Sequence, residues 1–142
     1  MDQTLPSEIQ LSVVTPAREV AHEKVRGVTV PGKSGYLGIL PGHAPLLSEL
    51  QAGELTYERE SSTEYLAVSR GFVEVLPERV IVLADTAIRG HDLDEAKASD
   101  ALKRAEEARA KATDKLEIAA AQSEFAMMAA QLAAIRKLRP KH

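Results

Sequence analysis

One segment of the sequence has the residue types of a phosphate-binding loop. Residues 27–34 (GVTVPGKS) fit the pattern G-x-x-x-x-G-K-[ST], in which backbone amides surround phosphates and Lys33 would contact them. Residues 80–85 (VIVLAD) look like the apolar strand that ends in a magnesium-binding aspartate. If the pattern acts as such a loop, the chain is a small nucleotide-binding hydrolase centred on Lys33.

The residues that follow Lys33 argue against that chemistry. A phosphate loop needs a helix that begins at the lysine, because the amides and the dipole of its first turn face the phosphates. Helix-breaking residues follow instead, namely Gly35, Gly38, Pro41, Gly42 and Pro45. We therefore expect a tight turn at Gly32–Gly35, and the hydrolase is kept only as an alternative function.

The histidines and cysteines predict neither a metal site nor a catalytic residue. None of the four histidines stands at a metal-ligand spacing or beside a carboxylate arranged for catalysis. The chain has no cysteine, which excludes disulfides and thiolate chemistry. His43 lies in residues 40–45 (LPGHAP), where proline and glycine restrict the backbone. Its imidazole either caps local backbone groups or is presented to a partner, and both alternatives stay open.

Composition limits the classes of partner. The 142 residues are 44% hydrophobic and 27% charged, which is typical of one folded domain, or of a small domain with an appendage. The net charge of -3 gives no overall positive field toward nucleic acid. We expect no signal peptide and no segment near the roughly 20 apolar residues of a membrane helix. Contact with a membrane is therefore expected only through a partner protein.

Glycine and proline divide the chain into two parts. All eight glycines and six of the seven prolines lie in residues 1–90, whereas residues 91–142 contain no glycine and 15 alanines. At least eight short apolar runs in the first part predict strands, and in one of them Ile9, Leu11 and Val13 alternate with polar residues. Short strands in this number indicate a sandwich or a barrel, of which we adopt the antiparallel β-sandwich as the predicted fold. The alanine-rich part predicts a two-helix antiparallel hairpin. The predicted fold class is α+β, with domains 1–90 and 91–142.

The two predicted helices share a simple pattern. Asp92 with Glu95, and Asp114 with Glu117, are capping-box spacings that can begin a helix. Each helix then carries one apolar stripe, formed by Ala98, Ala101, Ala105, Ala108 and Ala112 and by Ile118, Ala121, Phe125, Met128, Leu132 and Ile135. An interface lined with alanine buries little area, and neither glycine nor proline separates the helices. We expect a tail that can adopt two conformations.

Three segments resemble the epsilon-subunit family of bacterial F-type ATP synthases, which is homologous to the mitochondrial delta subunit. They are residues 34–55 (SGYLGILPGHAPLLSELQAGEL), 66–75 (LAVSRGFVEV) and 82–97 (VLADTAIRGHDLDEAK). The resemblance implies a non-catalytic rotor subunit of the central stalk, which couples proton-driven rotation to ATP synthesis. It also implies a peripheral position on the cytoplasmic face of the bacterial inner membrane.

The resemblance implies partners for both parts of the chain. The sandwich would bind the gamma subunit and the ring of c subunits through Gly32, Lys33, Ser34, Gly35 and His43. The helical tail of some relatives opens toward the alpha and beta subunits and suppresses ATP hydrolysis. The basic end, with Arg136, Lys137 and Arg139, would then face acidic residues on beta, although a purely solubilising role is an equal alternative.

The resemblance also implies a regulatory ligand. Some relatives bind ATP on the folded hairpin through a motif [IL]-D-x-x-R-A, which Leu93, Asp94, Lys97 and Ala98 match with lysine in place of arginine. Arg104 matches a further contact position. Because lysine lacks the planar, bidentate donor of arginine, we expect ATP to be a weak ligand. No other cofactor is expected.

Overall fold

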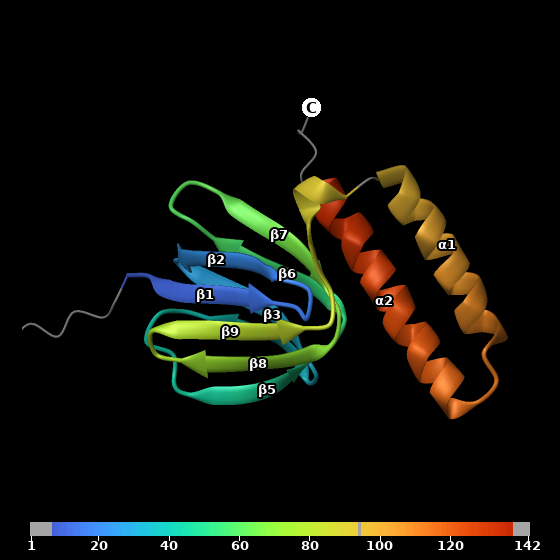
Figure 1. The fold of residues 1–142 in the computed structure, drawn as a ribbon, viewed down its shortest axis with the longest axis horizontal. Coiled ribbons are helices and arrows are strands. Elements are labelled where there is room, and N and C mark those ends of the chain that lie inside the picture. Colours follow the sequence, from blue (N-terminus) through green and yellow to red (C-terminus); the bar gives the residue numbers. More distant parts are fainter. Residues whose placement is uncertain (1–6, 94, 138–142) are drawn as a thin grey trace, which may run out of the picture.

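The computed structural model describes residues 7–93 and 95–137 and places two helices at one side of a β-sandwich (Figure 1). The strands are β1 (Ile9–Val14), β2 (Glu19–Val25), β3 (Gly27–Gly32), β4 (Gly35–Ile39), β5 (Leu46–Leu50), β6 (Gly53–Glu58), β7 (Thr63–Val68), β8 (Gly71–Leu76), β9 (Arg79–Ala84) and β10 (Ala87–Arg89). A short 3-10 helix, η1 (Gly90–Asp92), leads to α1 (Glu95–Lys111) and α2 (Lys115–Lys137). The last strand therefore ends, and the helical part begins, beside residue 90.

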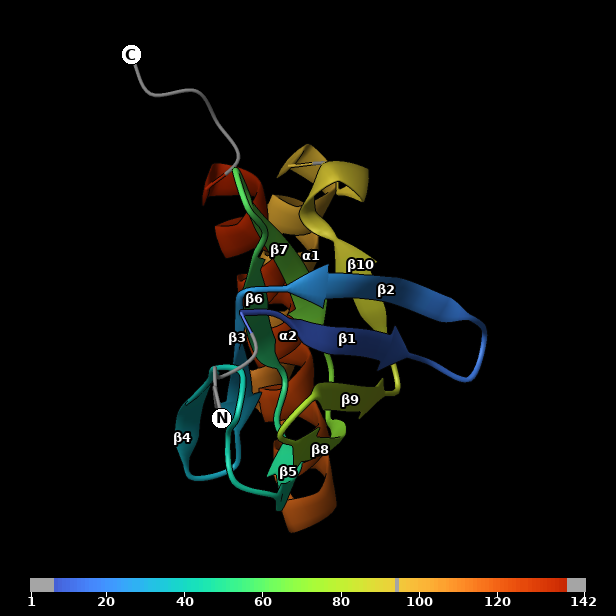
Figure 2. The ribbon, with the colours of Figure 1, turned by 90° about the vertical axis from the view of Figure 1, so that its left-hand side faces the viewer.

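The strands follow the order β10-β7-β6-β3-β5-β8-β9-β1-β2, and β4 pairs with β3 at one edge (Figure 2). β3 and β5 share one residue pair, Gly32 with Leu50, where the path passes from one layer to the other. The predicted α+β fold class is confirmed, with one difference in detail. β1 and β9 are parallel neighbours, although the other strand pairs of the described chain are antiparallel. Local alternation cannot predict this pair, because it joins distant parts of the sequence.

The core lies between the two layers and is made of large apolar side chains. In β1, Ile9, Leu11 and Val13 are buried while the residues between them are half-buried, which is the alternation that the sequence predicted. The largest fully buried side chains include Tyr57 and Leu66 from the opposite layer. These residues fill the sandwich without any contribution from the helices.

The capping prediction is right for α2 and wrong for α1. The Glu117 amide donates to Asp114 Oδ1 at 2.8 Å, and the Glu117 carboxylate accepts from the Thr113 amide at 3.1 Å. These bonds satisfy amides at the start of α2. Asp92 instead ends η1, and α1 begins only at Glu95. The chain makes a 3-10 turn first, so Asp92 does not occupy the N-cap position of α1.

α2 packs against two neighbours, whereas the sequence predicted one apolar stripe. It lies between α1 and the sandwich (Figure 1). Met127 and Ala130 pack on Ala67 of β7, and Leu132 is buried as well. Phe125, from the predicted stripe, is only half-buried. An 18-residue window of α2 has a mean hydropathy of 1.2, so by length and composition alone α2 could cross a membrane, although the sequence predicted no such segment. A core helix of a soluble protein passes the same test.

Candidate partner-binding site

The predicted turn at Gly32–Gly35 is the hairpin connection between β3 and β4, with Lys33 and Ser34 at its tip. Geometry requires both glycines. A Cβ atom on Gly32 would lie 2.8 Å from the Gly35 carbonyl oxygen, and Gly35 has a φ of +130°. Gln51 Nε2 donates to the carbonyl oxygens of Gly32 at 2.9 Å and of Lys33 at 3.1 Å. The turn therefore presents Lys33 and Ser34 on a braced backbone.

The surroundings of Lys33 exclude the phosphate-loop alternative. The chain continues from the turn into the strand β4, so Lys33 does not begin a helix whose first amides could face phosphates. Lys33 Nζ instead lies 3.0 Å from Glu49 Oε2 on β5. Asp85, the expected magnesium ligand, pairs with Arg70 at 3.8 Å. The hydrolase alternative is wrong because the residues fit the pattern but not the strand-loop-helix geometry that its chemistry requires.

His43 lies in the connection between β4 and β5, at the opposite end of β4 from the Lys33 turn. Its Nδ1 lies 2.7 Å from the Ala44 carbonyl oxygen, so Nδ1 donates to this oxygen, and Nε2 is an acceptor in the neutral form of the ring. The Gly42 amide donates to the Pro77 carbonyl at 2.8 Å and ties this connection to the turn between β8 and β9. The structure therefore does not bring His43 and the Lys33 turn together.

One outer face of the sandwich carries large exposed apolar side chains. Leu47 on β5, Phe72 on β8 and Leu83 on β9 are 69%, 52% and 51% exposed. Phe72 pairs with Leu83 on one side and with Glu49 on the other, and Leu47 pairs with Glu74, so these side chains share one face. α2 packs on β6 and β7, at another side of the sandwich (Figure 1). We call Leu47, Phe72 and Leu83 the apolar face.

The apolar face and the Lys33 turn form a continuous surface. Glu49 joins them, because its carboxylate receives Lys33 while its strand position lies opposite Phe72. Sequence reasoning missed the apolar face. The sequence does indicate this face through the unbroken apolar run in β9. A strand with only one buried face needs an apolar residue at every second position only, so the additional apolar residues of β9 must lie on the outer face.

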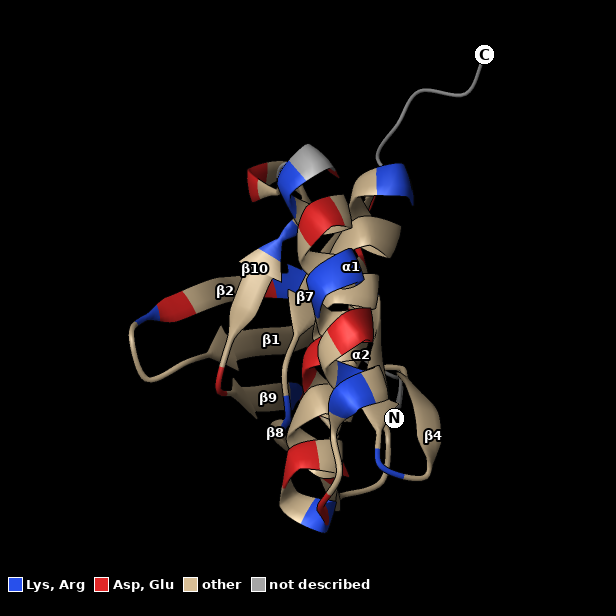
Figure 3. Ribbon diagram, turned by 90° about the vertical axis from the view of Figure 1, so that its right-hand side faces the viewer, with Lys and Arg blue, Asp and Glu red and all other residues tan. Residues whose placement is uncertain are grey.

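A pocket of about 570 Å³ lies between the C-terminal part of α1 and the N-terminal half of α2. A second pocket, of about 490 Å³, lies near η1. The second pocket brings together four of the five predicted nucleotide-contacting residues, while Asp94 lies outside the described residues. Its lining comprises Ile88, Asp92, Leu93, Lys97, Ala98, Asp100, Ala101, Arg104 and Gln131. Basic and acidic residues alternate along the outer side of α1 (Figure 3). The carboxylates of Asp92 and Asp100 line the pocket together with Lys97 and Arg104.

The described basic residues at the end of α2 have partners within the chain. Arg136 Nε lies 3.9 Å from Glu95 Oε1 on α1. Lys137 Nζ donates to Glu54 Oε1 on β6. Arg139, the third residue of the predicted beta-facing group, lies outside the described residues. In this conformation both described side chains are used to fold the tail.

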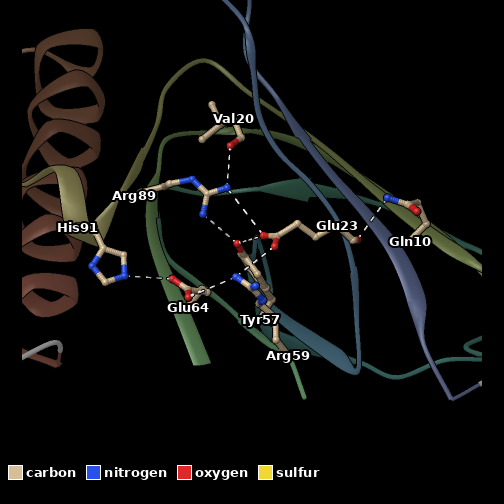
Figure 4. A network of polar contacts seen from close by, with 8 residues as sticks. All are labelled: Gln10, Val20, Glu23, Tyr57, Arg59, Glu64, Arg89 and His91. Atoms are coloured by element: carbon tan, nitrogen blue, oxygen red, sulfur yellow. Dashed lines mark hydrogen bonds and ion pairs between the residues drawn. The ribbon is translucent and has the colours of Figure 1, made fainter. Parts of the chain in front are cut away.

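A polar network connects the sandwich to η1 (Figure 4). The buried Tyr57 hydroxyl donates to Glu23 and accepts from Arg89 Nη1 at 3.0 Å. Burial and the hydrogen bond to Glu23 raise the pKa of Tyr57 to about 12. His91 Nε2 of η1 lies 3.3 Å from Glu64 Oε2.

The residues 7–93 and 95–137 hold no group of three or more His, Cys, Asp or Glu that could bind a metal ion.

The sequence profile described as "ATP synthase, Delta/Epsilon chain, beta-sandwich domain" matches residues 8–90. The chain belongs to this ATP synthase delta/epsilon family. An ATP synthase epsilon chain from Polynucleobacter necessarius is 48% identical over 136 residues, which cover 95% of this chain and 99% of the relative. An epsilon chain from Polaromonas naphthalenivorans is 47% identical, with 94% and 97% of the two chains covered.

Solved structures with a similar fold come from the same family of complexes. A chain of the Euglena gracilis mitochondrial ATP synthase, in a structure titled OSCP/F1/c-ring in rotational state 1, has a TM-score of 0.78 and 22% identity. The aligned region covers 95% of this chain and 86% of the Euglena chain. A chain of the Tetrahymena thermophila central stalk/c-ring structure has a TM-score of 0.58 and 16% identity, with 93% and 99% covered. These similarities support the fold.

Membership in the delta/epsilon family decides two further points. The relatives are named as epsilon chains, so this chain is a subunit of the ATP synthase complex and not the catalytic one. It is associated with the membrane as part of that complex. The family match covers the sandwich, which carries the Lys33 turn, His43 and the apolar face.

Proposed function

We propose that this chain is a rotor subunit of the bacterial F-type ATP synthase, which couples proton-driven rotation to ATP synthesis on the cytoplasmic face of the inner membrane. Membership in the delta/epsilon family supports the role. The titles of the two similar structures name an F1/c-ring and a central stalk/c-ring assembly. The observation that carries the proposal is the apolar face, because a cluster of exposed large apolar side chains is typical of a surface that binds another protein.

Each part of this surface suits a different partner. The apolar face would pack against gamma, where Phe72 supplies the large aromatic contact that dominates many interfaces. The adjoining Gly32–Gly35 turn presents Lys33 and Ser34, which suit a polar loop of the c ring. His43 offers an acceptor nitrogen at the other end of β4. The opened tail would reach the alpha and beta subunits and restrain ATP hydrolysis.

A charged substitution in the apolar face tests the binding of gamma. We expect Phe72→Asp, and independently Leu83→Asp, to reduce copurification of gamma with the tagged chain at least ten-fold, because a charge would be buried in the interface. Leu116→Asp is the matched control, because Leu116 is 85% exposed at the far end of the hairpin. It should bind gamma normally. If Phe72→Asp remains folded by circular dichroism and retains gamma, the proposed interface is incorrect.

We further propose ATP as a weak regulatory ligand of the pocket near η1. The pocket groups Lys97 and Arg104, which would contact phosphates, but Asp92 and Asp100 oppose a polyanion. We expect Lys97→Arg to tighten ATP binding and Arg104→Ala to abolish it, as measured by isothermal titration calorimetry. Lys103→Ala removes an exposed positive charge that does not line the pocket and should change the affinity little. Equal affinity in all four proteins would reject this pocket as the ATP site.

A further inference from the structure

Glu54 of β6 is a charged side chain in a buried position. It is 8% exposed, and Lys137 at the end of α2 donates to its Oε1. Its Oε2 has no hydrogen-bond partner among the described residues. A carboxylate that is withdrawn from water is unfavourable unless a partner compensates it, so Glu54 depends on Lys137 while α2 covers it.

Apart from Glu54, the surface of the sandwich that α2 covers is small and apolar. Ala67, Met127 and Ala130 form its buried cluster, and the half-buried Ala52, Ile88 and Met128 pack against it. Three of these six residues are alanines, which contribute little buried area, so the apolar contact is modest for a helix of this length. The Lys137 ammonium also lies 5.3 Å from the centroid of the Tyr65 ring on β7, where a cation is attracted to the ring face. The charged end of α2 is thus attached to the sandwich at two points.

Arg136, the residue before Lys137, contacts a different element from the one that Lys137 contacts. Its guanidinium pairs with Glu95 on α1, so it links the two helices. Lys137 links α2 to the sandwich. The hydrogen bond to Glu54 raises the pKa of Lys137, which indicates that the docked state favours the charged lysine.

We propose that the Glu54–Lys137 pair is a latch that holds α2 on the sandwich, and that Lys137 must leave Glu54 before it can face an acidic partner. The two uses of Lys137 exclude each other, because one ammonium group cannot occupy both places. The second half of this statement rests on the proposed rotor function, whereas the latch concerns the chain alone. Tail release is therefore coupled to loss of a specific ion pair.

The latch predicts unequal effects of its two halves. Lys137→Ala leaves the Glu54 carboxylate buried and uncompensated in the docked state, and undocking returns it to water. Glu54→Gln removes the charge that needs compensation, so docking loses an ion pair but retains no buried charge. The double variant should therefore resemble Glu54→Gln alone. A simple loss of contacts would instead make the two single effects add.

Thiol labelling of the isolated full chain measures the undocked fraction. The chain has no cysteine, and Ala67 is fully buried beneath α2, so Ala67→Cys introduces one thiol that reacts only after undocking. In this background we expect Lys137→Ala to accelerate labelling about ten-fold or more and Glu54→Gln about two- to three-fold. Arg136→Ala, which removes the same charge one residue away, is the matched control and should stay within two-fold.

Two results would overturn the latch. One is a Lys137→Ala protein that labels no faster than Arg136→Ala, and the other is a double variant that labels as fast as Lys137→Ala. Thermal melting of each variant shows that the sandwich stays folded. These measurements need no gamma, so their failure would leave the proposed rotor function intact. Conversely, loss of gamma binding to the apolar face would not change the labelling rates.

Discussion

The sandwich and the helical hairpin are held together by side chains of different size. The sandwich core contains leucine, isoleucine, valine and the buried Tyr57, and most of these side chains have no exposed surface. The contact of α2 with the sandwich has only Ala67, Met127 and Ala130 as buried residues, with the half-buried Ala52, Ile88 and Met128 packed against them. A fully buried leucine or valine contributes roughly 1.5–3 kcal/mol, and an alanine methyl group only about 0.8 kcal/mol.

Because of this difference in packing, the sandwich is a rigid binding surface, whereas the helical hairpin is attached to it by a weaker contact. The apolar face and the Lys33 turn belong to the sandwich, where strand pairing and a full core determine their positions. The hairpin can leave without opening that core, because α2 contributes no residue to it. A binding platform and a movable regulatory element can therefore coexist in one short chain.

The largest expected effect comes from a cavity in the sandwich. Leu66 is fully buried, so Leu66→Ala should lower the free energy of unfolding by about 2–5 kcal/mol. Chemical denaturation followed by circular dichroism measures the change. Leu116→Ala, at an exposed site of the hairpin, should change it by less than about 0.5 kcal/mol. Similar losses in both variants would remove the contrast between the two regions.

Alkaline pH should weaken the sandwich through Tyr57. Its pKa is about 12 in the folded chain, against 10.0 for a tyrosine side chain in water, so the folded state retains the proton more strongly. The resulting stability is present below about pH 10 and is lost as the pH rises through about 12, by roughly 2–3 kcal/mol. Denaturation between about pH 8 and 12 should show this fall. Tyr57→Phe should give a shallower dependence, and an unchanged slope would contradict the assignment.

Overpacking should act on the hairpin alone. Ala105 is 4% exposed between the helices, so Ala105→Leu should destabilise their contact by about 1–3 kcal/mol. Hydrogen exchange should accelerate in α1 while the sandwich amides stay protected. Ala105 and Ala108 both line the pocket of about 570 Å³, but Ala108 is exposed, so Ala108→Leu is the matched control with little expected change. Faster exchange in the strands would show that the two regions unfold together.

The smallest effect is expected at the N-terminus of α2. Asp114→Ala removes the acceptor for the Glu117 amide and should destabilise the first turn by about 1 kcal/mol. Exchange of the amides at residues 115–118 should therefore become faster, as measured by nuclear magnetic resonance. Asp114→Asn retains a capping oxygen and should behave like the parent chain. Docking of α2, reported by the Ala67→Cys thiol, should be nearly unchanged.

Several features followed from the sequence because they depend on neighbouring residues. Alternation in β1 predicted which side chains enter the core, and the Asp114–Glu117 spacing predicted the start of α2. β5 and β10 were missed as strands. The residues of β5 (LLSEL) do not alternate between apolar and polar, and β10 has only three residues, too few for a visible pattern.

The candidate site was predicted in part. The sequence located the Gly32–Gly35 turn, because glycine and proline carry that information locally. Four residues that the family resemblance assigned to ATP line the pocket near η1, and their role there stays a prediction. It did not locate the apolar face. Phe72 and Leu83 are separate apolar residues in the sequence, and only strand pairing makes them neighbours.

The sequence by itself determined most of the strands, the two helices and the family, since each is encoded in local composition or in a contiguous motif. The tertiary structure alone decided the parallel pairing of β1 with β9, the apolar face and the partner of Lys137. Glu54 and Lys137 are 83 residues apart in the sequence, and their charges permit many pairings. Which pair forms depends on where α2 docks, and that depends on packing across the whole fold.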